Sequence, residues 1–186
     1  RTPFGYFRPL CMATFLADLR LWGLSPALFH LTNLTFIALS GVLLVLVIRR
    51  FTRDPRLAGL AGLLFAIHPY HVENAAWVAG RADPLFTLFF LGALLAYDRW
   101  RSAGRGVPLL ALLLFEAALL AKEAAISLPP LLLLIGLCDR GRRPGAAELS
   151  RGTLPILGVA LAHFLLLRPA ALGGPGFAPL SGFGTH

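Results

Sequence analysis

Residues 21–48 read LWGLSPALFHLTNLTFIALSGVLLVLVI, the longest run in the chain without Asp, Glu, Lys or Arg. About 20 apolar residues in a helix are enough to cross the hydrocarbon core of a bilayer, so this run predicts a membrane-spanning helix. The composition agrees, because 57% of the 186 residues are hydrophobic and only 14% are charged. A mean hydropathy of +0.74 indicates an integral membrane protein and excludes an ordinary soluble domain.

Apolar segments separated by short polar breaks predict an all-α polytopic membrane protein with about six transmembrane helices. The segments cover residues 27–48, 57–68, 84–97, 107–121, 124–138 and 153–167. Several are shorter than a full span, so flanking polar side chains must complete them.

Arginines gather in three alternate breaks between these segments. They are Arg49, Arg50, Arg53 and Arg56 in the first break, Arg99, Arg101 and Arg105 in the second, and Arg140, Arg142, Arg143 and Arg151 in the third. An excess of basic residues marks cytoplasmic loops. The other connections are therefore predicted to lie on the far, extracytoplasmic side.

The segment before the first span, residues 9–24, is interrupted by Asp18 and Arg20. Phe15, Leu19 and Trp22 recur in it at helical spacing, with Asp18 on another face. This pattern is typical of a helix that lies in the membrane interface. The alternative is a polar-ended continuation of the following span.

We expect one membrane domain over residues 1–186, belonging to an internal fragment that is truncated at both ends. Within it, residues 1–26 form an extracytoplasmic loop with the interfacial helix, 27–168 form the transmembrane bundle, and 169–186 begin another extracytoplasmic loop. Arg1 is not an initiator methionine, and no signal peptide opens the chain.

The net charge of +8 does not indicate nucleic-acid binding. A nucleic-acid surface needs a basic stripe with interleaved aromatic residues, whereas these arginines lie in loops between apolar segments. Cys11 and Cys138 fall on opposite predicted sides of the membrane, so no disulfide is predicted. The partner that the composition does require is a lipid bilayer.

A polar box lies between two of the predicted spans, at residues 68–83, which read HPYHVENAAWVAGRAD. It contains five ionisable side chains, His68, His71, Glu73, Arg81 and Asp83. Ionisable groups at membrane depth are costly, and they generally face a cavity or an interface with a function. The box is therefore the candidate functional site.

His68, His71 and Glu73 are the candidate metal ligands of the box. Pro69 separates the two histidines, and no further Cys or His completes a closed zinc site. Carboxylates beside a phosphate would instead suit a hard divalent cation. The alternative for both histidines is that they cap a span through backbone hydrogen bonds. The sequence assigns no cofactor and leaves a divalent cation open.

Cations able to hold a phosphate accompany the box on the predicted far side. Lys122 is the only lysine among 17 basic residues, and its compact ammonium is not equivalent to the planar guanidinium of Arg81 or Arg8. The alternative is structural ion pairing, of Arg81 with Asp83 and of Lys122 with Glu123. Both interpretations stay open on the sequence.

The box resembles the His-Pro-x-His-x-Glu…Gly-Arg-x-Asp stretch of the transmembrane and tetratricopeptide-repeat O-mannosyltransferases and their bacterial relatives. Three further short motifs follow the family's order, namely Phe7-Arg8-Pro9-Leu10, Phe29-His30-Leu31-Thr32-Asn33-Leu34 and Ala121-Lys122-Glu123. The resemblance runs from about Tyr6 to Arg168. These proteins are polytopic glycosyltransferases of the GT-C type, so a GT-C-like bundle is implied.

The resemblance also implies the substrates. The donor would be a polyprenyl- or dolichyl-phosphate sugar, carrying mannose or another hexose, and the acceptor a hydroxyl of a protein or glycan. The residues implied to face an extracytoplasmic substrate cavity are Lys122, Arg81, Arg8, His68, His71, Glu73, Asp83 and Glu123. The family's catalytic acid, which acts as base on the acceptor, is expected upstream of Arg1, so the fragment alone is expected to be inactive.

The chain departs from the family pattern at two positions. Phe7 stands where the family has Tyr, and Ile37 stands where relatives often carry His. The tetratricopeptide repeats that often follow the membrane domain are also absent from this sequence.

Taken together, the motifs predict an inverting membrane glycosyltransferase whose leaving phosphate is held by Lys122, Arg81 and Arg8. The arginine bias indicates a bacterium and hence its inner membrane, or the endoplasmic reticulum membrane if the source is eukaryotic. The alternative is a secondary transporter or lipid flippase that uses the same residues as a relay. It ranks second because the charges, apart from mid-segment Glu116, gather on one side and no internal repeat is visible. Glu116 is expected either to be protonated or to face Arg81 or Lys122.

Overall fold

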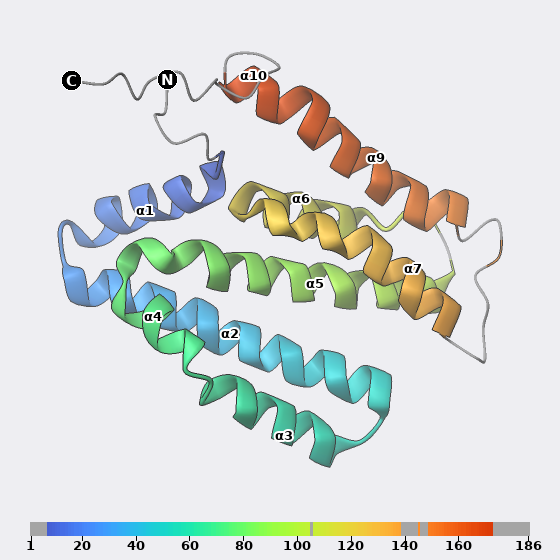
Figure 1. Cartoon of the computed structure of the whole chain (residues 1–186), viewed down its shortest axis with the longest axis horizontal. Coiled ribbons are helices and arrows are strands. Elements are labelled where there is room, and N and C mark those ends of the chain that lie inside the picture. Colours follow the sequence, from blue (N-terminus) through green and yellow to red (C-terminus); the bar gives the residue numbers. More distant parts are fainter. Residues whose placement is uncertain (1–6, 105, 139–144, 146–148, 173–186) are drawn as a thin grey trace, which may run out of the picture.

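The computed structural model describes residues 7–104, 106–138, 145 and 149–172, and every regular element in these ranges is a helix (Figure 1). This confirms the predicted all-α class. Arg105, Arg140, Arg142 and Arg143, together with the tail after Leu172, lie outside the described residues, as does Tyr6 at the start of the resemblance.

The first half of the chain forms a helical hairpin followed by the box. Helix α1 (Pro9–Trp22) precedes the hairpin of α2 (Pro26–Thr52) and α3 (Pro55–Ala66). The box forms α4 (Tyr70–Ala76) and a 3-10 turn, η1 (Val78–Arg81), which leads into α5 (Ala82–Ala103). The α2–α3 turn is local: Asp54 caps α3 by accepting hydrogen bonds from the amides of Arg56 and Leu57.

The second half adds helices that run back and forth along the first. They are α6 (Leu109–Ala121), η2 (Glu123–Ser127), α7 (Leu128–Cys138), the π-helical turn η3 (Leu149–Thr153), α9 (Leu154–Ala162), the π-helical turn η4 (His163–Leu167) and α10 (Arg168–Leu172). In Figure 1 the box, the start of α1 and the end of α6 lie toward one end of the bundle, and the α2–α3 turn lies at the other.

All six predicted apolar segments are largely helical, and three helices within the described ranges are long and apolar enough to cross a membrane. These are Pro26–Thr52, Val78–Ala103 and Ser150–Ala170. The shorter apolar helices cover Pro55–Ala66, Leu109–Ala121 and Glu123–Leu137. The six predicted segments therefore correspond to three membrane-length helices and three shorter apolar helices, which prolines or polar breaks flank.

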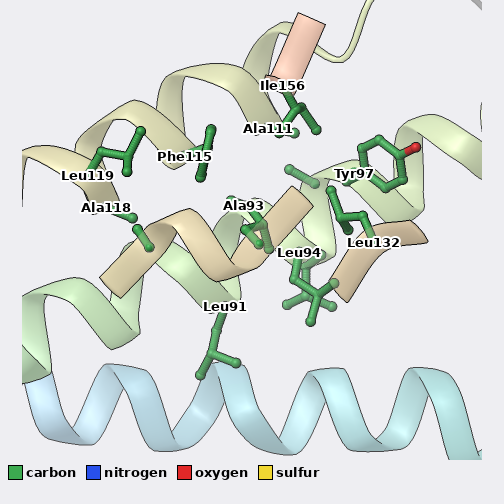
Figure 2. Close-up of a cluster of buried hydrophobic side chains, with 14 of the residues drawn as sticks. Leu91, Ala93, Leu94, Tyr97, Ala111, Phe115, Ala118, Leu119, Leu132 and Ile156 are labelled. Carbon is green, nitrogen blue, oxygen red and sulfur yellow. The ribbon is translucent and has the colours of Figure 1, made fainter. Parts of the chain in front are cut away.

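The core lies where α5 and α6 pack together, with α7 and α9 closing over them (Figure 2). Ala93, Ala111 and Ala118 are fully enclosed there, and Phe115 and Leu119 fill the space between them. Small side chains let helix backbones approach closely, and this van der Waals packing stabilises helix pairs inside a bilayer. Leucines on the outer faces stay exposed, as expected of a lipid-facing surface.

Helix α1 is a separate helix and not a continuation of the following span, so that alternative is wrong. The chain turns at Gly23, whose φ of 63° is in the left-handed region, and α2 begins three residues later. Asp18 is buried against the bundle, whereas Leu19 and Trp22 are 42% and 50% exposed. The helix therefore turns Asp18 inward and leaves Arg20 exposed together with the apolar Leu19 and Trp22.

Close packing of the α2–α3 hairpin depends on Gly62. A Cβ atom at this position would lie 2.4 Å from Cγ2 of Val45, whereas one at Gly59 would meet open space. Valine has one strongly preferred rotamer in a helix, so Val45 has little room to move away.

We expect Gly62→Ala to lower the free energy of unfolding by about 1–3 kcal/mol, because it overpacks the hairpin. Gly59→Ala is the matched control and should raise it by about 0.5–1 kcal/mol through helix propensity. Thermal unfolding in detergent measures both. Equal effects of the two substitutions would contradict the packing role of Gly62.

Candidate functional site

Arg81 of the box is completely buried, with no exposed side-chain surface. Its Nη2 lies 2.6 Å from Oδ2 of Asp18 on α1, and its Nε donates a 2.6 Å hydrogen bond to Oδ1 of Asn33 on α2. Nη2 also donates to the carbonyl of Phe29, and the Phe15 ring centroid lies 4.2 Å from the guanidinium carbon. A charge taken out of water needs such partners, and Arg81 has them from two other helices.

Asp18 completes this network from the side of α1. Thr32 donates a 3.1 Å hydrogen bond to Oδ1 of Asp18, whose side chain is buried like the guanidinium it faces, although slightly less completely. Sequence reasoning placed Asp18 among the upstream charges but did not pair it with Arg81. The predicted partner, Asp83, faces elsewhere. The available signal was that Asp18 is the single acidic residue of the mainly apolar α1 and would need a partner once buried.

Two side chains of α2, one helical turn apart, form hydrogen bonds with the backbone of the box. Nδ1 of His30 donates to the carbonyl of Ala75 at 2.7 Å, which fixes the proton on Nδ1 because a carbonyl can only accept. Nδ2 of Asn33 donates to the carbonyls of Asn74 and Val78, both at 3.2 Å. These bonds satisfy carbonyls at the end of α4 and the start of η1 that have no regular helix to continue into.

Lys122 and Asp83 form an ion pair between the end of α6 and the first turn of α5. The second carboxylate oxygen of Asp83 accepts a 2.8 Å hydrogen bond from the hydroxyl of Tyr70. That hydrogen bond, followed by the charge of Asp83, raises the pKa of Tyr70 above its ordinary value. The Lys122 and Asp83 side chains are 28% and 24% exposed, so both stay reachable from outside.

Arg8 and Glu123 form a second, neighbouring ion pair. Nη2 of Arg8 donates to both carboxylate oxygens of Glu123, at 3.2 and 3.4 Å, and Nε donates to one of them. Burial alone would raise the pKa of Glu123, but hydrogen bonds from its own amide and from Arg8 outweigh it, so the pKa is lowered. The charge of Arg168 acts in the same direction. The carboxylate is therefore ionised and is a weak base at neutral pH.

A groove of about 280 Å³ opens beside Asp83, between α2, α3, α4 and α5. Its residues include Ile37, His68, His71, Tyr70 and Asp83. Most of its exposed wall is apolar, and its polar side chains come mainly from the box, with Ser40 of α2 and Thr87 of α5 in addition. Such concave, mainly apolar spaces with few polar groups are typical ligand sites.

The two histidines of the box differ in environment. His68 is exposed, and its Nδ1 accepts a 3.2 Å hydrogen bond from the amide of Tyr70, which is the capping role that the sequence left open. His71 packs against Phe65, with ring centroids 4.3 Å apart. Burial and then the neighbouring His68 lower the pKa of His71 below 6.5, so its imidazole is neutral at pH 7.

The candidate metal ligands do not come together. The rings of His68 and His71 lie 6.3 Å apart between centroids, and Glu73 is exposed. Within the described ranges, no group of three or more His, Cys, Asp or Glu side chains is placed to hold a metal ion. Asp83 and Glu123 are each engaged by a cation. These residues do not fit a divalent cation site, so we derive no step through one.

Glu116, the mid-segment charge, faces neither Arg81 nor Lys122. Its Oε1 lies 2.8 Å from Nδ1 of His163, which is 2% exposed and opens the π-helical turn η4. This corrects the predicted partner. Sequence reasoning did not single out His163, although an imidazole inside a long apolar segment is itself a signal.

Several known proteins are similar to this chain in sequence. The chain is 38% identical over 136 residues to the protein O-mannosyl-transferase Tmtc1 of Drosophila melanogaster, covering 73% of this chain and 16% of that protein. It is 35% identical over 136 residues to TMTC3 of Homo sapiens, and this match covers 71% of the chain and 14% of that protein. It is 36% identical over 143 residues to TMTC4 of Homo sapiens, and this match covers 65% of the chain and 19% of that protein. No family model and no solved structure matches the chain.

This chain is homologous to a segment of the TMTC protein O-mannosyl-transferases. The resemblance predicted from four short motifs is thereby confirmed, and the chain spans about a sixth of the length of these relatives. The apolar helices and these relatives together identify an integral membrane protein.

The four motifs of that resemblance meet at one end of the bundle. The motif at Phe7–Leu10 supplies Arg8, which bonds Glu123 of the last motif. The motif at Phe29–Leu34 supplies His30 and Asn33, which hold the box. Segments far apart in the sequence therefore build one constellation, in which Arg81 is internal and Arg8, Lys122, Asp83 and Glu123 are partly exposed.

Removing one partner of a buried ion pair leaves an uncompensated charge. We expect Asp18→Asn and Arg81→Gln each to lower the free energy of unfolding by about 3–5 kcal/mol, and the double variant to lose less than the sum. Thermal unfolding of the two single variants and the double variant in detergent measures the coupling. Strictly additive losses would show that the pair does not interact.

His71 should make stability depend on pH. Its pKa is lower in the folded protein than the ordinary 6.5, so the unfolded chain binds protons more readily and stability is lost as the pH falls from 6.5 toward the lowered pKa. His71→Phe should flatten this part of the profile, whereas His68→Phe should change it less. Unfolding temperatures measured across this pH range provide the check, and an unchanged slope in His71→Phe would refute it.

Proposed function

We propose that the chain forms part of a GT-C membrane glycosyltransferase that acts on the extracytoplasmic side. In this proposal it transfers mannose or another hexose from a polyprenyl- or dolichyl-phosphate donor to a hydroxyl of a protein or glycan. The observation that carries it is the partly exposed cluster of Lys122, Asp83, Arg8 and Glu123 beside an apolar groove. The relatives named O-mannosyl-transferases supply the reaction class.

Lys122 is the group we assign to the donor phosphate. An ammonium has three N–H donors, and Asp83 occupies one side of it, so donors remain for a phosphate oxygen. Asp83, itself held by Tyr70, keeps the ammonium charged and fixes its direction. Arg8 is paired with the carboxylate of Glu123, the residue after Lys122, and adds a second positive charge nearby.

The chemistry explains why such cations are needed. The acceptor oxygen bonds to the anomeric carbon as the bond from that carbon to the phosphate oxygen breaks. The lipid phosphate leaves as a monoester and carries one more negative charge than it had in the diester. A fixed cation at this oxygen stabilises charge that develops in the transition state, which is the interaction that accelerates a reaction.

Arg81 takes a different part in the proposal from Lys122 and Arg8. Its enclosed guanidinium is engaged by Asp18, Asn33 and Phe29, so we assign it to positioning the box and, through it, Asp83. His68 and His71 line the groove and would contact the sugar or the lipid. Glu73 is exposed on α4 and keeps its predicted place at the cavity only as part of this proposal.

Acceptor activation is assigned to none of the described carboxylates. Asp83 and Glu123 are held by cations, and the lowered pKa of Glu123 makes it a poor proton acceptor at neutral pH. The proposal places the reaction at the bacterial inner membrane, or at the endoplasmic reticulum membrane in a eukaryote, with the Arg-rich end of the bundle in the cytoplasm.

The test uses the complete natural protein, purified in detergent and given labelled polyprenyl-phosphate hexoses. We expect release of polyprenyl phosphate, lowered by ~10²-fold or more in Lys122→Ala because a charge-stabilising contact is lost. Lys122→Arg should retain part of the activity. Arg56→Ala, an exposed arginine at the opposite end, is the control and should behave like the unmodified protein.

Equal release by Lys122→Ala and the unmodified protein would remove Lys122 from the donor phosphate. Absence of release with every hexose donor would instead oppose the transferase itself.

One observation favours the second candidate, a secondary transporter or lipid flippase. Glu116 and His163 place an ionisable pair inside the bundle, as proton-coupled carriers do. Movement of an ion or lipid by reconstituted vesicles, abolished by Glu116→Gln, would support this function. The names of the relatives rank it below the transferase.

A further inference from the structure

A basic groove lies at the end of the bundle opposite the candidate site. It has a volume of about 590 Å³ and is formed where the last turns of α2 and α5 lie side by side. Arg49, Arg50 and Arg53 line it from α2, and Asp98 and Arg99 line it from α5. Four arginines against one aspartate leave the lining with a net charge of plus three.

One arginine is fixed in the wall while the others remain available. Nε of Arg50 donates to Oδ2 of Asp98 at 2.5 Å, and its Nη2 donates to the hydroxyl of Ser102 at 2.6 Å. Arg49, Arg53 and Arg99 are exposed, and the described residues offer them no side-chain partner. Three of the four arginines that line the groove therefore have no ion-pair partner among the described residues, and the carboxylate of the lining, Asp98, is engaged by Arg50.

The backbone at Arg53 contributes to this concentration of charge. Arg53 ends α2 with a φ of 58°, an uncommon left-handed conformation for a residue other than glycine. Its amide donates to the carbonyl of Arg49, so the chain curls back and keeps both arginines at the same helix end. Positive side chains at a helix C-terminus also face the negative end of the helix dipole, which helps hold them there.

The groove is not only basic, because leucines form its other wall. Leu46 of α2 and Leu95 of α5 line it together with the arginines. Leu46 is 41% exposed, and Val42 and Leu39, one and two turns earlier on the same face of α2, are 57% and 47% exposed. An apolar track therefore leads from the arginines along the lipid-facing side of a membrane-length helix.

We propose that this groove binds an anionic phospholipid, with the headgroup phosphate between Arg49, Arg53 and Arg99 and an acyl chain along Leu46, Val42 and Leu39. Planar guanidinium groups match phosphate oxygens bidentately, and basic pockets between helices at the cytoplasmic surface suit anionic headgroups. The apolar track distinguishes a lipid from a free phosphate ion. The site is independent of the proposed transfer reaction.

The test measures lipid binding by the complete natural protein in detergent, with fluorescent phosphatidylglycerol as the probe. We expect Arg49→Gln/Arg53→Gln/Arg99→Gln to weaken binding by about 100-fold, given the typical contribution of each arginine near an anionic surface. The matched control is Arg56→Gln, an exposed arginine of α3 outside the groove, which should bind like the unmodified protein. The corresponding triple lysine variant keeps the charge and should retain most of the binding.

Other outcomes separate the alternatives. Equal binding of phosphatidylglycerol by the triple glutamine variant, when its unfolding temperature matches the control, would overturn the proposal. Equal affinity for phosphatidylcholine would show that the negative headgroup is not recognised. Complete displacement of the probe by inorganic phosphate would indicate a phosphate-ion site without a lipid track.

Discussion

The buried guanidinium of Arg81 is the interaction on which the rest of this end of the protein depends. Asp18, Asn33 and Phe29 come from two different helices to surround it. A charge enclosed this completely cannot be left without partners, so the positions of α1, α2 and the box are fixed relative to one another. Asn33 links Arg81 to the box backbone, because its side-chain oxygen accepts from Arg81 while its side-chain nitrogen donates to two carbonyls of the box.

The ion pairs next to this buried network differ from it, because they are partly exposed. Lys122, Asp83, Arg8 and Glu123 pair with one another but stay partly exposed, at the points where α5, α6 and α1 begin or end. The enclosed charges hold the helices together, whereas the partly exposed ones are those that the proposed function assigns to a ligand. The same division recurs at the opposite end, where Arg50 is fixed by Asp98 and its neighbours are not.

The helical class, the six apolar segments and the grouping of site residues could be predicted, because hydropathy and loop charge are local properties of the sequence. Which charges pair could not. Arg81 and Asp83 are two residues apart, yet Arg81 turns inward to Asp18 and Asp83 turns to Lys122. Glu116 likewise meets His163, since partners depend on how helices pack and not on their spacing along the chain. The three short helices could be predicted as well, because they cover nearly the same residues as the apolar segments 57–68, 107–121 and 124–138.

Those short helices have a consequence for the surrounding lipid. Helices α3 and α6 contain 12 and 13 residues, which corresponds to about 18–20 Å of rise, while a bilayer's hydrocarbon layer is about 30 Å thick. Either the layer thins around them or their polar ends sink below the headgroups. In both cases the charged cluster lies closer to the apolar layer, so in the proposed reaction a lipid-linked sugar would travel a shorter distance from the bilayer to Lys122.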